Sequence, residues 1–215
     1  MTDFSRRFST LDTNAVHAAA PEPNIEGAVV TPIFQSANYL MAQEATYDEV
    51  RYIRMSNSPN HRVLQSRLAV LESGEEALGA ASGLAASSSA ILGHVGQGEH
   101  LLAQRTLYGG TQSFLDHDAP RFGIESDSID ITDPGGADAW SERLRPDTRL
   151  IYVEAISNPL MEVGDLQAVV AFARDHGLVS MIDSTFASPV NLRPLEIGFD
   201  LVVHSATKYL NGHSD

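Results

Sequence analysis

The sequence predicts an α/β fold in which a mostly parallel sheet is sandwiched by helices. From residue 58 onward, short apolar runs alternate with longer amphipathic ones, which is typical of βαβ units. The segments that connect these runs end in small and polar residues, which favours a ligand-binding edge at the carboxyl ends of the strands. The chain has 215 residues, of which 43% are hydrophobic, and can therefore bury one substantial core.

The first part of the chain, residues 1–57, predicts an extended arm. It shows little helical or alternating periodicity, and prolines at positions 21, 23 and 32 interrupt any regular element that they join. We therefore expect two parts: this arm and an α/β domain over residues 58–215.

Regular elements begin after Asn60. Apolar residues recur at helical spacing as far as Leu71, and Gly74 marks the end of that helix. Beyond it, the apolar runs predict strands over residues 77–81, 101–103, 128–131, 150–154, 178–183 and 201–204. The amphipathic runs predict helices over residues 83–93, 110–118, 137–144 and 166–176.

The composition excludes several classes of function. With 28 acidic and 14 basic residues the net charge is −14, and the basic residues are scattered, so neither nucleic acid nor an anionic membrane surface is an expected partner. The absence of cysteine excludes disulfides, thiolate zinc sites and cysteine nucleophiles. The histidines show no metal-ligand spacing, and no apolar run has the length of a signal or membrane-spanning segment. We expect a cytoplasmic protein without a metal.

Three segments at predicted strand ends carry candidate chemistry. A loop after the last strand holds two hydroxyls, which can bond a phosphate, and an amine, which can act as a nucleophile when desolvated: Ser205, Thr207 and Lys208. The turn at Ser82-Gly83-Leu84 opens a helix whose free amides can bind an anion. The strand over residues 178–183 ends in the carboxylate of Asp183.

Each segment also has a plainer interpretation when it is taken alone. A lysine after a strand is usually a solvated surface residue, a glycine turn commonly just joins a strand to a helix, and an aspartate commonly caps the next helix. Together, the segments supply what pyridoxal phosphate requires: a lysine for the Schiff base, a carboxylate for the pyridine nitrogen and donors for the phosphate.

The segment SATKYLNGHSD, residues 205–215, resembles the cofactor-lysine motif of the Cys/Met-metabolism family of pyridoxal-phosphate enzymes. The resemblance extends over residues 25–215 through further ordered blocks: ASGLAA at 81–86, LYGGT at 107–111, SNP at 157–159 and DSTFASP at 183–189. It implies the large-domain fold of aspartate-aminotransferase-like enzymes and a pyridoxal 5'-phosphate cofactor.

The resemblance also implies roles for the matching residues. Lys208 would bind the cofactor covalently and then carry protons, and Tyr108 would stack on the ring and assist proton transfer. Asp183 would pair with the pyridine nitrogen, and Asn158 would lie near the phenolic oxygen. The remaining members of the expected cofactor set are Ser82, Gly83, Leu84, Thr185, Ser205 and Thr207. Glu154 is expected to be structural.

The arm acquires a role from the same resemblance. The segment RYIR, residues 51–54, resembles the family's Tyr-x-Arg, which reaches across a dimer interface to the phosphate of the neighbouring subunit. Tyr52 and Arg54 would therefore complete the site of another chain, in a homodimer or homotetramer. The plainer interpretation is a solvated arm.

Two positions depart from the patterns of individual reactions. Ser113 stands where cystathionine-handling members usually carry an arginine, and Gly110 stands where methionine γ-lyases typically carry a cysteine. The resemblance implies transsulfuration by β- or γ-elimination or replacement on sulfur amino acids. We expect a lyase or transferase of the cystathionine γ-lyase or γ-synthase type, with O-acylhomoserine sulfhydrylase and methionine γ-lyase as alternatives.

The chain ends directly after a strand and a polar loop, with no helix to cover that strand. We therefore expect an N-terminal portion truncated before a C-terminal substrate domain, where an arginine would bind the substrate α-carboxylate. Two interpretations come from other classes: an inactive fragment of such an enzyme, and a nucleotide-binding α/β domain. The second lacks a G-x-G-x-x-G after the first strand and a Walker lysine.

Overall fold

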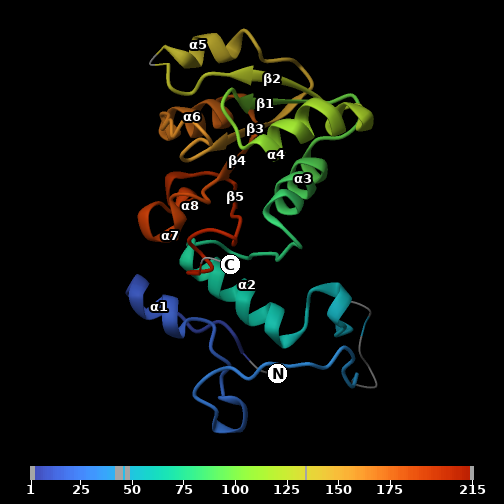
Figure 1. Cartoon of the computed structure of the whole chain (residues 1–215), viewed down its shortest axis with the longest axis vertical. Coiled ribbons are helices and arrows are strands. Elements are labelled where there is room, and N and C mark those ends of the chain that lie inside the picture. The colour runs from blue at the N-terminus through green and yellow to red at the C-terminus, as the bar shows by residue number, and fades with distance from the viewer. Residues whose placement is uncertain (1–2, 42–45, 47–48, 134, 214–215) are drawn as a thin grey trace. The chain divides into compact units, whose positions relative to one another are not determined.

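A computed structural model describes residues 3–41, 46, 49–133 and 135–213 (Figure 1). The chain divides into two compact units, Met1–Gly79 and Ala80–Asp215, which we call the N-terminal and C-terminal units. The N-terminal unit thus contains the helix expected after Asn60 as well as the predicted arm. Ser214 and Asp215, the last two residues of the lysine motif, lie outside the described residues.

The N-terminal unit contains a helix that the sequence did not predict. Helix α1 (Leu11–His17) is capped by Thr10, whose Oγ1 accepts a hydrogen bond from the backbone N–H of Thr13 at 3.3 Å. None of its residues is buried, so no apolar stripe marks it in the sequence. The 3-10 turns η1 (Ile25–Gly27) and η3 (Ile53–Met55) lie between α1 and the next α-helix in the described part of this unit.

Helix α2 (Pro59–Leu71) confirms the prediction of a helix after Asn60. Ser58 caps its start, with the hydroxyl accepting a hydrogen bond from the backbone N–H of His61 at 3.5 Å. Pro59 occupies the first turn, where its missing N–H costs no intrahelical bond. Arg67 Nε donates to the carbonyl of Ala18 at 2.9 Å, which ties α2 to the end of α1.

The segment between η1 and η3 exposes apolar side chains, among them Val29, Val30, Ile33 and Leu40. Its backbone is held at Phe34 by Asn60, which accepts from the N–H of Phe34 at 3.0 Å and donates to its carbonyl at 2.7 Å, and at Ala37, whose carbonyl accepts from the N–H of Ile53 at 3.1 Å. The segment is therefore anchored, but these four side chains find no core within the described part of the N-terminal unit.

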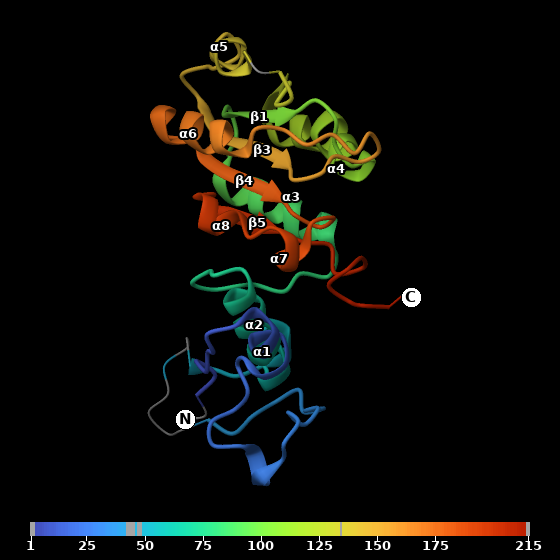
Figure 2. The same cartoon turned by 90° about the vertical axis from the view of Figure 1, so that its left-hand side faces the viewer.

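The C-terminal unit is built on a five-stranded sheet with the order β2-β1-β3-β4-β5 (Figure 1), of which Figure 2 shows β1, β3, β4 and β5 from the side. Its strands are β1 (His100–Gln104), β2 (Glu125–Ile129), β3 (Thr148–Glu154), β4 (Val179–Asp183) and β5 (Leu201–Val203). All neighbouring pairs are parallel, which confirms the predicted sheet and brings all carboxyl ends to one edge. Strand β2 lies earlier in the chain than the predicted 128–131.

The strand predicted over residues 77–81 is wrong. These residues form no strand, and Leu78 is 80% exposed. A short alanine-containing run has little intrinsic preference for a strand and becomes one only beside a partner strand. The five strands of the sheet do not include residues 77–81, so this segment has no partner strand there.

Helices cover both faces of the sheet (Figure 1). Alternate residues of one strand point to opposite faces, so Leu101 packs with Ile91 of α3 (Gly83–His94), while Leu102 shares a core with Phe172 of α6 (Leu166–His176). The other helices are α4 (Gly109–Ser113), α5 (Gly136–Ser141), α7 (Ser188–Asn191) and α8 (Pro194–Ile197), with a π turn η4 (Phe114–Asp118) and a 3-10 turn η5 (Ala119–Phe122).

The helix prediction over residues 166–176 is confirmed to the residue, because Asp165 caps the start of α6 and Gly177 ends it in a left-handed conformation. The helix predicted over 110–118 changes to a π turn at Phe114, and that over 137–144 ends at Ser141. Helices α7 and α8 were not predicted, because four residues are too few to show a helical period.

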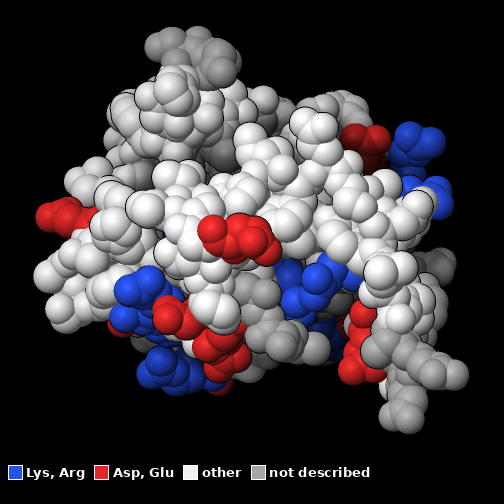
Figure 3. Space-filling model, turned by 90° about the horizontal axis from the view of Figure 1, so that it is seen from below, with Lys and Arg blue, Asp and Glu red and all other residues white. Residues whose placement is uncertain are grey.

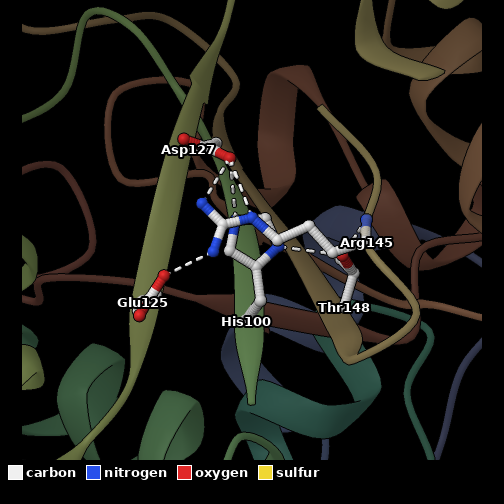
Figure 4. A network of polar contacts seen from close by, with 5 residues as sticks. All are labelled: His100, Glu125, Asp127, Arg145 and Thr148. Atoms are coloured by element: carbon white, nitrogen blue, oxygen red, sulfur yellow. Dashed lines mark hydrogen bonds and ion pairs between the residues drawn. The ribbon is translucent and has the colours of Figure 1, made fainter. Parts of the chain in front are cut away.

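A polar network joins the amino ends of three strands (Figure 4). His100, which is fully buried, lies with Nδ1 2.8 Å from Thr148 Oγ1 and with Nε2 3.3 Å from Asp127 Oδ2. Arg145 Nη2 donates to the same Asp127 oxygen at 2.8 Å, and Nη1 donates to Glu125. Burial, followed by the charge of Arg145, lowers the pKa of His100, which Asp127 opposes. Side-chain hydrogen bonds and ion pairs therefore connect the amino ends of these strands, at the end of the sheet opposite the carboxyl ends.

On the face seen in Figure 3, acidic and basic side chains are interspersed, and neither sign covers a continuous area. Among the described helices, none combines the length and the apolar character needed to cross a membrane. Within the same described residues, no group of three or more metal-ligating side chains could hold a metal ion.

Candidate active site

A cavity of about 290 Å³ opens at the carboxyl edge of the sheet, within the C-terminal unit. Ten of the twelve predicted site residues line it: Ser82, Gly83, Leu84, Tyr108, Asn158, Asp183, Thr185, Ser205, Thr207 and Lys208. They come from the start of α3 and from the segments after β1, β3, β4 and β5. Segments that are far apart in the sequence therefore converge because parallel strands end at one edge.

The start of α3 forms one wall of the cavity. Ser82 caps the helix, and its hydroxyl accepts from the N–H of Ala85 at 3.1 Å. The earlier amides of the first turn have no partner inside the helix and point out of its end. A Cβ atom added to Gly83 would lie 2.7 Å from Cβ of Ser205, so only glycine lets the helix approach the loop after β5 so closely.

The loop after β4 joins the carboxylate of Asp183 to the loop after β5. Asp183 Oδ1 accepts from the N–H of Thr185 at 2.8 Å, which fixes the orientation of the carboxylate at the end of the strand. The hydroxyl of Thr185 in turn accepts from the N–H of Ser205 at 2.8 Å. Thr185 therefore links Asp183 to Ser205 through two hydrogen bonds.

Lys208 lies in a turn after β5. It is exposed and lines the cavity. Its backbone N–H donates to the carbonyl of Ser205 at 3.3 Å, and its carbonyl accepts from the N–H of Asn211 at 3.2 Å. Thr207, which precedes it, lines the same cavity. The turn therefore presents an amine and two hydroxyls, those of Ser205 and Thr207, to one space.

Tyr108 lies at the start of α4 and is half exposed. Its ring lies against Gly110, because a Cβ added there would be 2.5 Å from Cε1 of the ring. Gly110 thus provides the surface against which the Tyr108 ring packs. An aromatic ring in this position can stack on a planar ligand in the cavity.

The floor of the cavity contains Glu154, at the end of β3, which is 4% exposed. One carboxylate oxygen accepts from the N–H of Tyr108 at 2.6 Å and the other from the N–H of Asn158 at 3.0 Å. Burial raises the pKa of Glu154 to about 7, and these two N–H groups oppose the shift, whereas Asp183 adds to it.

The other two predicted residues, Tyr52 and Arg54, belong to the N-terminal unit. Tyr52 precedes the turn η3, and Arg54, within that turn, is exposed. The guanidinium carbon of Arg54 lies 4.8 Å from the centroid of the Tyr52 ring, within the range of a cation–π contact. The pair is therefore a defined local feature of that unit.

A family model described as Cys/Met metabolism PLP-dependent enzyme matches residues 12–215. The chain belongs to this family. The resemblance that the motifs indicated is thereby confirmed. The match includes both the cavity and the Tyr-x-Arg segment of the N-terminal unit.

Relatives in this family have different reactions in their names. An L-methionine gamma-lyase of Porphyromonas gingivalis is 42% identical and covers 94% of this chain and 52% of its own length. A cystathionine beta-lyase of Bacillus subtilis is 37% identical and covers 98% of this chain and 53% of its own length. The chain thus spans about half the length of these relatives.

The fold is that of the family's solved structures. A protein of Campylobacter jejuni assigned as an O-acetylhomoserine (thiol)-lyase has a TM-score of 0.87 at 30% identity, covering 97% of this chain and 52% of that one. That structure carries N'-pyridoxyl-lysine-5'-monophosphate. The predicted α/β fold with a parallel sheet is therefore confirmed as that of a pyridoxal-phosphate enzyme.

The sequence analysis did not assign a role in the site to five lining residues: Ser87, Thr111, Glu154, Ile156 and Phe186. Glu154 stands two residues before the SNP block, and a charged residue that ends an apolar strand is a signal that could have drawn attention to it. Ser87 lies one helical turn beyond Gly83 on α3, so helical spacing could have indicated it.

Proposed function

We propose that the chain binds pyridoxal 5'-phosphate in this cavity. The observation that carries the proposal is the convergence of an amine, a carboxylate and a helix start on one space: Lys208, Asp183 and the first turn of α3. The set suits the cofactor, because it offers an amine for the aldehyde, a carboxylate for the pyridine nitrogen and a cluster of neutral donors for the phosphate in separate places.

The phosphate would be held at the start of α3. The amides of Gly83 and Leu84 point out of the helix end, where the helix dipole also favours an anion. Ser205 and Thr207 add hydroxyls, and the close contact of Gly83 with Ser205 keeps both donor groups on one side of the cavity. Ser82 and Thr185 hold the backbone of these donors in place.

The ring would lie between Asp183 and Tyr108. Bound pyridoxal phosphate supplies an electron sink for a carbanion of the substrate. Asp183 Oδ1 is oriented by Thr185, and the carboxylate holds a proton at the pyridine nitrogen by its charge. Tyr108 would stack on the face of the pyridine ring, and Asn158 would lie near its phenolic oxygen, since both residues line the cavity.

Lys208 would bind the cofactor through Nζ and then carry a proton to and from the substrate carbons. Its place in an exposed turn gives the amine the freedom that such a transfer requires. The Tyr108 hydroxyl assists proton transfer toward the leaving group. Both residues line one cavity, so one substrate can contact both.

For the whole protein we propose β- or γ-elimination or replacement on a sulfur amino acid or an activated homoserine, as a cytoplasmic enzyme of cysteine and methionine metabolism. Relatives named for several of these reactions support the class. Within it we propose the cystathionine γ-lyase or γ-synthase type. Ser113 weakens the assignment to cystathionine, and the similarities to an O-acetylhomoserine (thiol)-lyase and to methionine γ-lyases support the two alternatives, O-acylhomoserine sulfhydrylase and methionine γ-lyase.

We also propose a homo-oligomer, a dimer or tetramer, in which Tyr52 and Arg54 of one chain reach the phosphate of another. The exposed apolar side chains between η1 and η3 support this arrangement, since a second chain would remove Val29, Val30 and Ile33 from water. Arg54 is exposed, so its guanidinium can bind a phosphate outside its own unit.

The cofactor assignment is tested by absorbance. The protein purified with pyridoxal phosphate should show a visible absorbance band that the cofactor-free protein lacks. Lys208→Ala should remove that band, because no covalent bond can form at position 208. Lys208→Ala that keeps the band, or a wild-type protein without it, would refute the assignment.

The reaction is tested by competition. Cystathionine, methionine and an O-acylhomoserine with sulfide are supplied in turn, and ketoacid and thiol products are measured. Preferred turnover of cystathionine would support the proposed type, whereas preference for another substrate would select the corresponding alternative.

A further inference from the structure

Among the described residues that line the cavity, Glu154 is the acidic side chain to which the proposed function gives no role. Its carboxylate is buried at the end of β3, and Asp183 is its register partner on β4. The buried carboxylate of Glu154 and the partly buried carboxylate of Asp183 lie on neighbouring strands and repel each other, and burial disfavours the ionised form of Glu154. The position therefore carries an electrostatic cost that a neutral residue would avoid.

The hydrogen bonds of Glu154 require two acceptors. One oxygen receives the N–H of Tyr108 at 2.6 Å and the other receives the N–H of Asn158 at 3.0 Å. A glutamine of the same shape has one acceptor oxygen and one NH₂ group, so one of the two N–H groups would face a donor. A carboxylate is the side chain of this length that satisfies both.

The two N–H groups belong to loops from different strands. Tyr108 follows β1 and Asn158 follows β3, and both residues line the cavity. The strand end that carries Glu154 is itself fixed, because its N–H donates to Oε1 of Gln104 at 2.8 Å. Glu154 thus connects a rigid strand to the two loops whose side chains flank the cavity.

We propose that Glu154 is a positioning residue: its carboxylate fixes the main chain at Tyr108 and Asn158 and so orients both side chains toward the cofactor ring. This inference rests on the proposed function, since it assigns Glu154 a task at the proposed cofactor. Glu154 does not touch the reacting atoms in this account. It acts through the two residues that it holds.

The test compares Glu154→Gln with wild type in two measurements. Visible circular dichroism of bound pyridoxal phosphate reports the orientation of the ring in its site, and steady-state kinetics separates kcat from KM. In Glu154→Gln we expect the absorbance band to remain, the dichroism to change, and kcat to fall on the order of 10- to 100-fold with KM little altered. Glu154→Asp keeps the charge but is shorter, so its kcat should lie between those of wild type and Glu154→Gln.

Asp200→Asn is the matched control. Asp200 is also a carboxylate that accepts a backbone N–H, that of Ser180 at 2.8 Å, together with the Ser180 hydroxyl at 2.7 Å. It precedes β5, at the end of the strands opposite the cavity. The control should lower the unfolding midpoint without changing the dichroism or kcat.

The outcomes separate the two proposals. A wild-type protein without the absorbance band would refute the proposed function. A wild-type band combined with unchanged dichroism and kcat in Glu154→Gln would overturn the role of Glu154 alone. If Glu154→Gln does not fold, amide hydrogen exchange in the wild type decides: protection of the amides of Tyr108 and Asn158 supports the inference, and fast exchange of both overturns it.

Discussion

Because residue 83 is a glycine and has no Cβ atom, the start of α3 and the loop after β5 can approach each other closely. Gly83 begins α3, and Ser205 follows β5, yet the glycine Cα faces the serine with no room for a methyl group. The amides proposed to bind the phosphate and the hydroxyl proposed to join them are brought together by this contact. The glycine is thus required by close approach and not by an unusual backbone angle.

Gly83→Ala should therefore weaken pyridoxal phosphate binding. The added Cβ would meet Ser205 at 2.7 Å, and relieving such a clash costs about 1–3 kcal/mol, which corresponds to a loss of roughly 5- to 150-fold in affinity. The measurement is a titration of the visible band with cofactor.

Gly93→Ala provides the control for that titration. It lies on the same helix, and an added Cβ there meets nothing within 4 Å. It should leave cofactor affinity unchanged and raise stability by up to about 1 kcal/mol, because alanine is the better helix former. Equal affinities for the two variants and wild type would contradict the role of the contact.

The sequence motifs predicted ten of the residues that line the cavity, but Glu154 was expected to be structural only. A motif identifies residues whose types match a known chemistry, such as Lys208 and Asp183. The proposed task of Glu154 depends on which backbone amides its carboxylate meets, and those amides belong to loops whose paths are set by tertiary structure. Residue types alone do not contain that information.

At the scale of elements, prediction succeeded where the residues at the two ends of a segment are themselves signals for its start and its end. Helix α6 has an aspartate cap, an apolar face and a terminal glycine, and it was predicted to the residue. Strands β1, β3 and β4 were predicted from apolar runs with small errors at their ends. Residues 77–81 failed, because a strand needs a partner, and helix α1 was missed, because it buries no face.

The polar network at the amino ends of β1, β2 and β3 should make the stability of the sheet depend on pH. The pKa of His100 is lowered from its ordinary value of 6.5 by burial, so the unfolded chain takes up a proton before the folded one does. As pH falls below about 6.5, stability is lost, with a slope of at most about 1.4 kcal/mol per pH unit for one proton. Above that pH, this contribution is constant.

Thermal unfolding at a series of pH values between about 5 and 8 measures this effect. His100→Gln removes the titrating ring, so its midpoint should fall less steeply than that of wild type as pH decreases. His94→Gln, at the exposed end of α3, removes one histidine elsewhere and should keep the wild-type slope. Equal slopes for wild type and His100→Gln would show that the network does not couple to protons.

At the scale of the whole molecule, the proposed oligomer makes each site depend on two chains. Lys208 lies in the C-terminal unit, whereas Arg54 lies in the N-terminal unit that is proposed to serve a neighbouring chain. Two different inactive variants could then repair each other within one dimer. A site formed within one chain could not be repaired in this way.

Mixing Lys208→Ala with Arg54→Ala under conditions of subunit exchange should therefore restore activity. Half of the randomly formed dimers contain one chain of each variant, and each of these has one site with both residues intact. About a quarter of the wild-type activity is expected. Each variant alone, carried through the same exchange, is the control, and a mixture no more active than these would contradict a shared site.

The contact between Gly83 and Ser205 links cofactor binding to completion of the sheet. Ser205 follows β5, a strand of three residues that pairs with β4 in the described sheet, whereas Gly83 precedes β1. A phosphate held by both would bind only molecules in which that short strand is docked. By mass action, bound cofactor would then lower the fraction of molecules in which β5 is detached from β4.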